Sequence, residues 1–230
     1  MALSLFGALP FYTGGYVPTY VDAFFECVSG FTTTGASILP NVEALPKSVL
    51  FWRSLTHLVG GMGVLVLSLA LMPRLSENAM QLLKAESTGP APGKLVPRMG
   101  QSAKLLYGIY LALTLVEVIV LCICGLDLYD ALIHAFGSAG TGGFSNYALS
   151  VGQFQSPAVD AVIAVSMLLF GVNFSLFYLL LQRNFKAVFQ NSELRAYLLI
   201  VFLSVAAIAV NILPQVQNVG RALQQSFFQV

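Results

Sequence analysis

The stretch DAFFECVSGFTTTGAS occupies residues 22–37, and a stretch of the same design, DALIHAFGSAGTGGFS, occupies residues 130–145. Each opens on an aspartate, continues as a short and mostly apolar run, and ends in a cluster of glycine, threonine and serine. Such a run is too short to cross a bilayer, which takes about 20 helical residues. Longer apolar runs flank both stretches, so each is predicted to be a short helix that enters the membrane part way. The chain then returns as an extended loop whose carbonyls line a water-filled space.

Composition places the whole chain in a membrane. Of its 230 residues, 57% are hydrophobic and only 9% are charged, against about 25% charged in an ordinary soluble domain. The formal net charge of +1 gives no electrostatic footprint for nucleic acid. Three cysteines exclude a disulfide scaffold, and Cys122 and Cys124 are interpreted as small buried apolar side chains rather than a metal or redox pair.

Four apolar runs are long enough to span about 30 Å of hydrocarbon. They are Phe51–Pro73, Ala103–Gly125, Ala158–Leu181 and Leu194–Leu213. Residues 1–16 form a shorter apolar stretch, interrupted by Pro10, which we expect to be the outer part of a further membrane helix. The sequence therefore predicts an all-α, multi-pass membrane protein.

Charge asymmetry orients these spans. Lysine and arginine gather in segments 74–104 and 182–195, whereas segment 126–160 has neither and segment 17–50 has Lys47 alone. Because basic residues are retained on the cytoplasmic side, the first two segments are predicted to be cytoplasmic. Both Gly/Thr loops then face the outside.

The predicted organisation is a repeated unit of helix, pore helix, filter loop and helix. Gly35 and Gly142 follow the opening aspartates at nearly the same spacing, so they are predicted to be equivalent positions of the two units. A third unit is expected to open at Arg221, and its loop would fall beyond residue 230. The predicted segments are 1–74 (first unit), 75–102 (cytoplasmic connector), 103–182 (second unit) and 183–230 (connector and incomplete third unit).

Several motifs resemble the Trk/Ktr/HKT superfamily of potassium transporters, and in particular its TrkH branch. The matching segments are 22–26, 29–30, 32–36, 60–63, 142–145 and 173–174. This resemblance implies a fold similar to a potassium channel made from one polypeptide, with four helix–pore helix–helix units around one pore. The present chain would hold two units and the opening of a third.

The same resemblance implies transmembrane potassium uptake in the inner membrane of a bacterium, and the sequence leaves the choice between potassium and sodium open. It implies no enzymatic activity and no cofactor beyond the transported ion, and a homodimer that binds a cytosolic nucleotide-binding regulatory subunit. The predicted filter residues are Thr32, Thr33, Thr34, Gly35, Ala139, Gly140, Thr141, Gly142 and Gly143. Among them, potassium is expected to contact Thr33, Thr34, Gly35, Gly140, Thr141 and Gly142.

These residue types suit a dehydrated potassium ion. An extended Thr/Gly backbone can turn successive carbonyls toward an axis, and glycine tolerates the positive φ that such an arrangement requires. The pore helices would also aim their negative C-terminal ends at the ion. Asp22 and Asp130 are predicted to cap the pore helices, with attraction of cations as a second role.

The same residues allow other interpretations. Residues 30–37 imitate a phosphate-binding loop, but Ala36 replaces the lysine that reaches the phosphates. The glycines of segment 60–63 are predicted to serve close helix packing rather than ion binding. His57 and His134 lack further ligands at metal-site spacing, and His134 is expected to be a hydrogen-bonded member of the second pore helix.

Two polar residues interrupt the predicted spans. Glu117 is expected to be a protonated, hydrogen-bonded residue that faces another helix or a subunit contact, with a transport role as the alternative. Asn173 is expected to make a hydrogen bond within the bundle near the pore. The alternative function is a membrane-embedded enzyme or scaffold whose loops bind a polar head group. A nucleophile and base would favour that function, and we expect no histidine with a carboxylate orienter near the loop hydroxyls.

The orientation is testable with single cysteines in a background that lacks the native three. Cysteines at Ala91 and Asn184 should react with a membrane-impermeant thiol reagent only from the cytoplasmic side, and one at Gln153 only from outside. Labelling at Ala91 in intact cells would contradict the predicted orientation.

Overall fold

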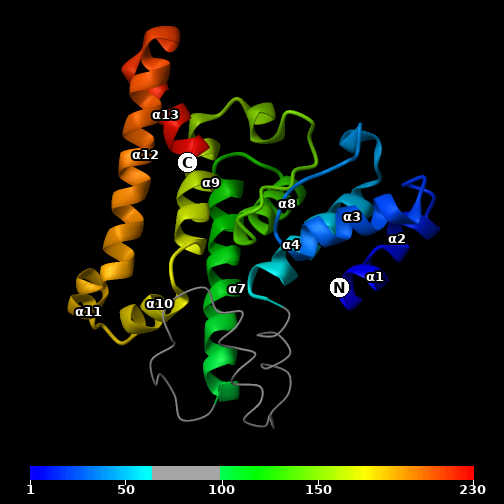
Figure 1. Cartoon of the computed structure of the whole chain (residues 1–230), viewed down its shortest axis with the longest axis horizontal. Coiled ribbons are helices and arrows are strands. Elements are labelled where there is room, and N and C mark those ends of the chain that lie inside the picture. The colour runs from blue at the N-terminus through cyan, green and yellow to red at the C-terminus, as the bar shows by residue number, and fades with distance from the viewer. Residues whose placement is uncertain (64–98) are drawn as a thin grey trace.

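The computed structural model describes residues 1–63 and 99–230, and every regular element within these two ranges is helical (Figure 1). This agrees with the predicted all-α class. The second half of the first predicted span and most of the predicted connector 75–102 lie outside the described residues.

The first unit contains the short helices α1 (Ala2–Gly7) and α2 (Leu9–Thr13), the pore helix α3 (Tyr20–Phe31), the 3₁₀ turn η1 (Val42–Ala44) and α4 (Lys47–Gly61). The 12 residues of α3 are about 18 Å long at the helical rise, so α3 cannot cross a bilayer alone. Its buried face packs Ala23 and Cys27 against Ala8 and Phe11, and this contact fixes where the first loop begins.

The second unit repeats this arrangement. The long helix α7 (Met99–Ile123) leads to the pore helix α8 (Leu128–Ala139), and the 3₁₀ helix η2 (Ser150–Phe154) leads to α9 (Pro157–Phe170) and α10 (Phe174–Leu181). Helix α8 has the same 12-residue length as α3. It packs Ala131 and Ala135 between Leu121 of α7 and Val159 of α9. Small residues therefore let the pore helix lie deep between two longer helices.

The chain ends with α11 (Phe185–Gln190), α12 (Ser192–Val216) and α13 (Val219–Gln229). The Asn218 side chain caps α13 by accepting from the amide of Arg221. Ala222 of α13 is fully buried, as are Ala23 of α3 and Ala131 of α8. The helix that the sequence placed at the opening of a third unit is therefore present.

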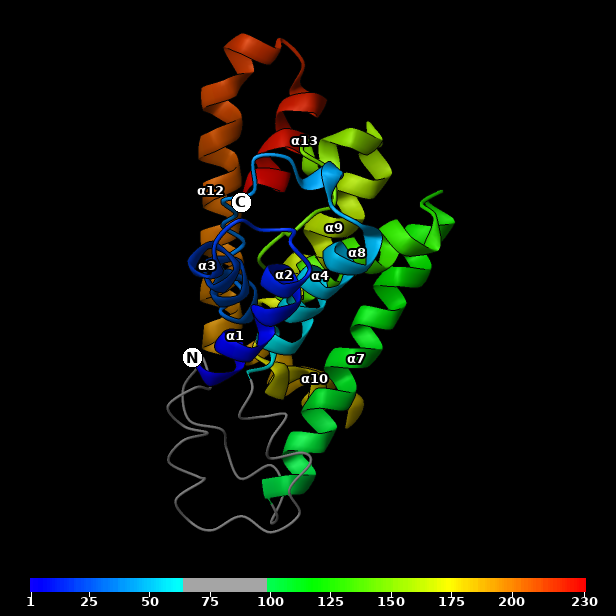
Figure 2. The ribbon, with the colours of Figure 1, turned by 90° about the vertical axis from the view of Figure 1, so that its right-hand side faces the viewer.

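Among the described residues, two helices are long and apolar enough to span a membrane, or three if the bent pair α9–α10 is counted as one span. Both views show α7 and α12 running in the same general direction, with α9 between them (Figures 1 and 2). Much of α12 is exposed, including Leu199 and Phe202. An apolar surface of this kind is compatible with lipid or with further helices, and not with water.

The fourth predicted span, Ala158–Leu181, is not one straight helix. It bends by 92° between α9 and α10. At the bend, the Asn173 side chain accepts from the amide of Ser175, which caps α10, and donates to Glu193 Oε2 on α12 at 3.1 Å. Asn173 is therefore a helix cap at the start of α10 rather than a polar residue within a continuous span.

Two glycines bring α4 against the ends of both pore helices. A Cβ on Gly60 would lie 3.0 Å from the carbonyl oxygen of Gly30, near the end of α3. A Cβ on Gly61 would lie 2.9 Å from the carbonyl oxygen of Ala139, at the end of α8, and would also meet the Tyr110 hydroxyl. Close packing of helices is therefore the role of these glycines, as predicted from the sequence.

Gly61→Ala should destabilise the protein by about 1–3 kcal/mol, because the added methyl group has no free space. Unfolding in mixed detergent, followed by the fluorescence of Trp52, the single tryptophan, would measure the change. Gly108→Ala is the matched control, since it lies within α7 and has open space around its Cβ position. If the two variants have the same free energy of unfolding, close packing at Gly61 is not the reason for its glycine.

Candidate ion-coordination site

The two pore helices begin in the same way. Thr19 Oγ1 accepts from the amide of Asp22 in α3, and Asp127 Oδ1 accepts from the amide of Asp130 in α8. The caps are therefore Thr19 and Asp127, and the prediction that Asp22 and Asp130 are the caps is wrong. Both aspartates lie in the first helical turn, where a negative charge still favours the positive end of the helix dipole.

The two pore helices also end in the same way. Each passes into its loop through a tight turn, with Thr33 N donating to Gly30 O at 3.0 Å and Thr141 N donating to Ser138 O at 2.8 Å. The next amide donates to the carbonyl oxygen five residues earlier. Thr34 N donates to Ser29 O, and Gly142 N donates to Gly137 O. These bonds use the carbonyls of the last helical turn.

The backbone after each turn adopts an uncommon conformation. Thr33 and Thr141 both have φ of 54°, and Gly35 and Gly143 have φ of 76° and 74°. Positive φ is rare for a β-branched residue and is costly without glycine. Strain repeated at equivalent threonines is a feature of functional sites, and it turns the carbonyls in a direction that a regular strand would not allow.

The backbone fixes the register in which the two units are equivalent. The caps, the turn amides and both positive-φ positions all repeat in the register that pairs Thr33 with Thr141 and Gly35 with Gly143. The predicted pairing of Gly35 with Gly142 is therefore wrong by one position. Gly142 has another reason to be glycine, because a Cβ there would lie 2.7 Å from the carbonyl oxygen of Thr33 and 2.6 Å from His57 Cε1.

The two loops approach each other closely. A Cβ on Gly35 would collide with the carbonyl oxygen of Gly142, and Gly140 lies beside the Thr33 methyl group. The structure thus brings the two predicted groups of filter residues, 32–35 and 139–143, to one place. They come from distant segments of the sequence.

Behind the first loop, side chains of α3 hold the chain that leaves this loop. Ser29 Oγ donates to Ala36 O at 2.6 Å. Glu26 Oε1 accepts from Ser37 Oγ and from the amide of Ile38, both at 2.7 Å. The first loop is therefore anchored at its exit by a carboxylate that is almost wholly buried.

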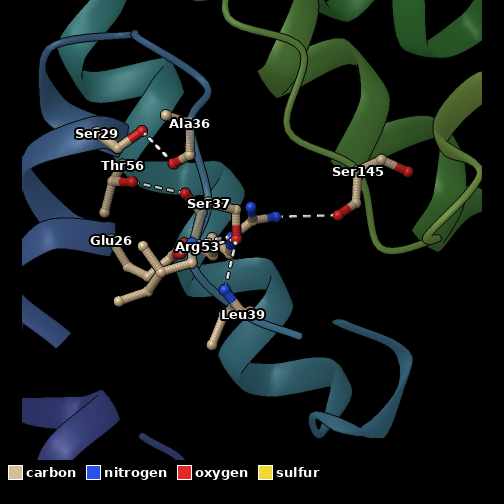
Figure 3. A network of polar contacts seen from close by, with 9 residues as sticks. Glu26, Ser29, Ala36, Ser37, Leu39, Arg53, Thr56 and Ser145 are labelled. Carbon is tan, nitrogen blue, oxygen red and sulfur yellow. Dashed lines mark hydrogen bonds and ion pairs between the residues drawn. The ribbon is translucent and has the colours of Figure 1, made fainter. Parts of the chain in front are cut away.

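Arg53 of α4 joins the two loops (Figure 3). Its Nε donates to Glu26 Oε2 at 3.0 Å in a buried ion pair. Its Nη1 donates to the carbonyl oxygen of Ser145, in the segment that follows the second loop, at 3.0 Å. The guanidinium also lies over the Phe144 ring, 3.6 Å from its centroid. One side chain thus contacts the anchor of the first loop and the exit of the second.

The second loop has a different anchor at the equivalent positions. His134 of α8 takes the place that Glu26 has in α3, and its Nε2 is 3.1 Å from Ser145 Oγ. His134 Nδ1 is 2.8 Å from the carbonyl oxygen of Asp130, so Nδ1 carries the proton and a neutral Nε2 accepts from the serine. The predicted hydrogen bonding of His134 within the pore helix is present.

The pair of Ser145 and His134 places a histidine beside a loop hydroxyl. Its geometry is still unsuited to nucleophilic catalysis. The orienting group is a backbone carbonyl and not a carboxylate, and Ser145 Oγ also accepts from the amide of Tyr147. Both side chains are buried. The contact therefore anchors the loop, as Glu26 and Ser37 do in the first unit.

Asp130 fixes the outer part of the second loop. Its carboxylate accepts from Asn146 Nδ2 and from the Tyr147 hydroxyl, both at 2.8 Å. The hydrogen bond to Asp130 raises the pKa of the Tyr147 phenol above its usual value. On the same outer side, Glu43 Oε1 accepts from the amide of Ala148 at 3.0 Å, and this contact connects the first unit to the second.

Two further polar side chains are buried near the loops. His57 stacks on Phe144 with ring centroids 3.9 Å apart, and neither of its ring nitrogens has a hydrogen-bond partner among the described residues. Glu117 of α7 is buried in the bundle against α8 and α9. No cluster of metal-ligating side chains occurs within the ranges 1–63 and 99–230.

Sequence reasoning did not assign Arg53, Ser145 or Phe144 to the site. A signal for Arg53 was available, because it is a charged residue inside a predicted span and such a residue needs a partner. The identity of that partner was not accessible, since Glu26 and Ser145 are 27 and 92 residues away in sequence.

Paired pore helices that end in strained, glycine-rich loops, held from behind by buried polar side chains, define a membrane protein of the ion-channel and ion-transporter class. Comparison with known proteins agrees: residues 1–219 match the TrkH family of cation transport proteins. The chain belongs to this family.

Individual relatives support the assignment. The chain is 40% identical over 199 residues to the Trk system potassium uptake protein TrkH of Escherichia coli K12, covering 85% of this chain and 41% of that protein. It is 38% identical to TrkH of Salmonella typhimurium, covering 97% of this chain and 47% of that protein. The crystal structure of the potassium transporter TrkH from Vibrio parahaemolyticus is similar with a TM-score of 0.82 at 31% identity, covering 99% of this chain and 47% of that one. The chain thus spans less than half the length of these relatives.

The Arg53 contacts predict a specific stability pattern. Arg53→Met leaves the buried Glu26 carboxylate without its partner and should cost about 3–5 kcal/mol. Adding Glu26→Gln removes the unpaired charge and should recover part of that loss. Unfolding followed by Trp52 fluorescence would measure both variants, with Arg195→Gln, an exposed arginine, as the control. A double variant as unstable as the sum of the two single variants would contradict a coupled ion pair.

Proposed function

We propose that this chain supplies two filter loops of a pore that takes up potassium across a bacterial inner membrane. The observation that carries the proposal is the repeated loop geometry. Two segments far apart in sequence share the same turn hydrogen bonds and the same pair of positive-φ residues, and they meet at Gly35 and Gly142. Family membership supports the same function.

In this proposal the ion is coordinated by backbone carbonyls of segments 32–35 and 139–143, assisted by threonine hydroxyls. Contacts are expected from Thr33, Thr34, Gly35, Gly140, Thr141 and Gly142. The equivalence of Gly35 and Gly143 supports Gly143 as one of the predicted filter residues of the second loop. Several carbonyls are needed at once because they replace the hydration shell of the ion.

In such a filter, the buried polar contacts would hold the loop backbone in place. Carbonyl dipoles that converge on one axis repel each other, so each loop must be held from its outer side. Arg53 donates to the anchors of both loops, Glu26 and Ser145. The ends of α3 and α8, which lie just before the loops, add negative potential where a cation would sit.

The rest of the assembly is inferred from the family. We propose that the whole protein acts as a homodimer that binds a cytosolic nucleotide-binding regulatory subunit, and that potassium is preferred over sodium. Transport assays should use a hybrid protein, in which this chain replaces the matching segment of the Salmonella typhimurium relative. The hybrid supplies the part of the relative that this chain does not cover.

Filter variants of the hybrid test the proposal. Gly35→Ser and Gly143→Ser each place a side chain at a positive-φ position, and Gly35 also lies against the opposite loop. We expect the preference for potassium over sodium to fall by about tenfold or more, which corresponds to about 1.4 kcal/mol of differential binding. Fluxes of both ions in proteoliposomes would measure it.

Gly152→Ser is the matched control for these variants, because it lies in the outer helix η2 with open space around its Cβ position. Its ion preference should equal that of the unmodified hybrid. An unchanged preference in both filter variants, with normal membrane insertion, would count against these loops as the coordination site.

A further inference from the structure

Glu117 is a buried carboxyl group that the proposed filter does not use. It lies in the C-terminal half of α7 and is 3% exposed. The hydroxyls of Ser138 on α8 and Ser166 on α9 lie beside the carboxyl. Neither carboxyl oxygen makes a hydrogen bond of good geometry with any described residue. Glu117 therefore faces the back of the second pore helix, and not lipid or a subunit contact.

Among the described residues, no basic side chain is placed to neutralise this carboxyl. The helices packed most extensively against α7 are α8, α9 and α10, and none of the three contains a lysine or an arginine. Helix α4 also touches α7, where Tyr110 donates to the carbonyl oxygen of Leu58. Of the basic side chains of α4, Arg53 is paired with Glu26 and Lys47 lies over the Tyr129 ring. The other titratable groups of these helices and of the described part of α7 are His57, Lys104, Tyr107, Tyr110, Cys122, Tyr129, Asp130, His134, Asp160 and Tyr178. Lys104 lies more than three turns away on the same helix, and His134 already uses both ring nitrogens. A charged Glu117 would thus be buried without a counter-charge.

The hydrogen-bonding capacity of Ser138 indicates which form of Glu117 fits. The Ser138 hydroxyl donates its only proton to His134 O at 2.9 Å. Its oxygen can still accept, and only a protonated carboxyl has a proton to donate. An ionised Glu117 could bond to Ser138 only if the bond from Ser138 to His134 broke.

Ser138 connects this carboxyl to the filter. It is the second-last residue of α8, and its carbonyl oxygen accepts from the amide of Thr141 at 2.8 Å. Thr141 is the strained threonine of the second loop. A displacement of Ser138 would thus be transmitted to Thr141 through a single hydrogen bond.

We propose that Glu117 is a positioning residue, held as an uncharged carboxylic acid that donates a hydrogen bond to Ser138 Oγ and fixes the last turn of the second pore helix. Its place in transport rests on the proposed filter function. Its chemical state does not, so the two are tested separately.

Infrared spectroscopy of the chain in lipid bilayers tests the chemical state. At neutral pH the protein should show the C=O stretch of a protonated carboxylic acid that is lost in Glu117→Gln. In Ser138→Ala the band should move to higher frequency, because the acid loses its acceptor. The proposal would be overturned if Glu117→Gln lost no carboxylic acid band, or if the band of Ser138→Ala stayed at the frequency of the unmodified protein.

Transport by the hybrid protein tests the positioning role. Glu117→Gln keeps a donor and an acceptor and should preserve the ion preference within about twofold. Glu117→Leu and Ser138→Ala should each lower the preference for potassium about fivefold, the equivalent of one hydrogen bond, and the double variant should be little worse than either one. Thr114→Val is the control, since the Thr114 hydroxyl bonds only within α7.

Equal preference in Glu117→Gln and Glu117→Leu would overturn the positioning role. A hybrid that shows no potassium preference before any substitution would instead count against the proposed function, and the infrared result would still decide the state of Glu117.

Discussion

The buried ion pair between Glu26 and Arg53 is the interaction on which the loop region depends. Glu26 belongs to the first pore helix, Arg53 to α4, and the same guanidinium reaches the carbonyl oxygen of Ser145 beyond the second loop. A buried pair of this kind adds little net stability, because desolvation offsets the attraction, but removing one partner is costly. The pair therefore acts chiefly to hold two distant segments in one arrangement.

The two units share a backbone and differ in the side chains that hold it. Glu26 with Ser37 and His134 with Ser145 occupy equivalent positions in the two units. His134 is neutral and needs no counter-charge. Helix α9, which follows the second loop as α4 follows the first, accordingly contains no arginine. Arg53 serves both loops as a result, and this links the geometry of one filter loop to that of the other.

Much of this architecture could be predicted from the sequence, because it depends on local signals. Short apolar helices that end in Gly/Thr clusters indicated the two short helices and their loops, and a helix containing Arg221 is present where the sequence predicted one. The packing role of Gly60 and Gly61 was also predicted, since adjacent glycines inside a membrane helix serve close approach.

The errors have physical causes. Residues 142 and 143 are both glycine, so the sequence does not show which of them is equivalent to Gly35. Only the positive φ that Gly143 shares with Gly35 identifies Gly143 as the equivalent position. Hydropathy is continuous through Gly171 and Val172, so it does not detect the 92° bend between α9 and α10. An acidic residue in the first turn and a true N-cap look alike in sequence, and the caps are Thr19 and Asp127, three residues before Asp22 and Asp130, from whose amides they accept. The contacts of Arg53 and of Ser145 with His134 arise only when the chain has folded.

Locating a bound cation tests the central claim most directly. Thallium scatters anomalously and has a charge and size close to those of potassium, so crystals of the hybrid protein grown with thallium would reveal the coordinating atoms. The account predicts an anomalous peak between the two loops, in contact with carbonyls of both Thr33–Gly35 and Gly140–Gly142. Thallium bound elsewhere in the pore, with neither loop in contact, would contradict it.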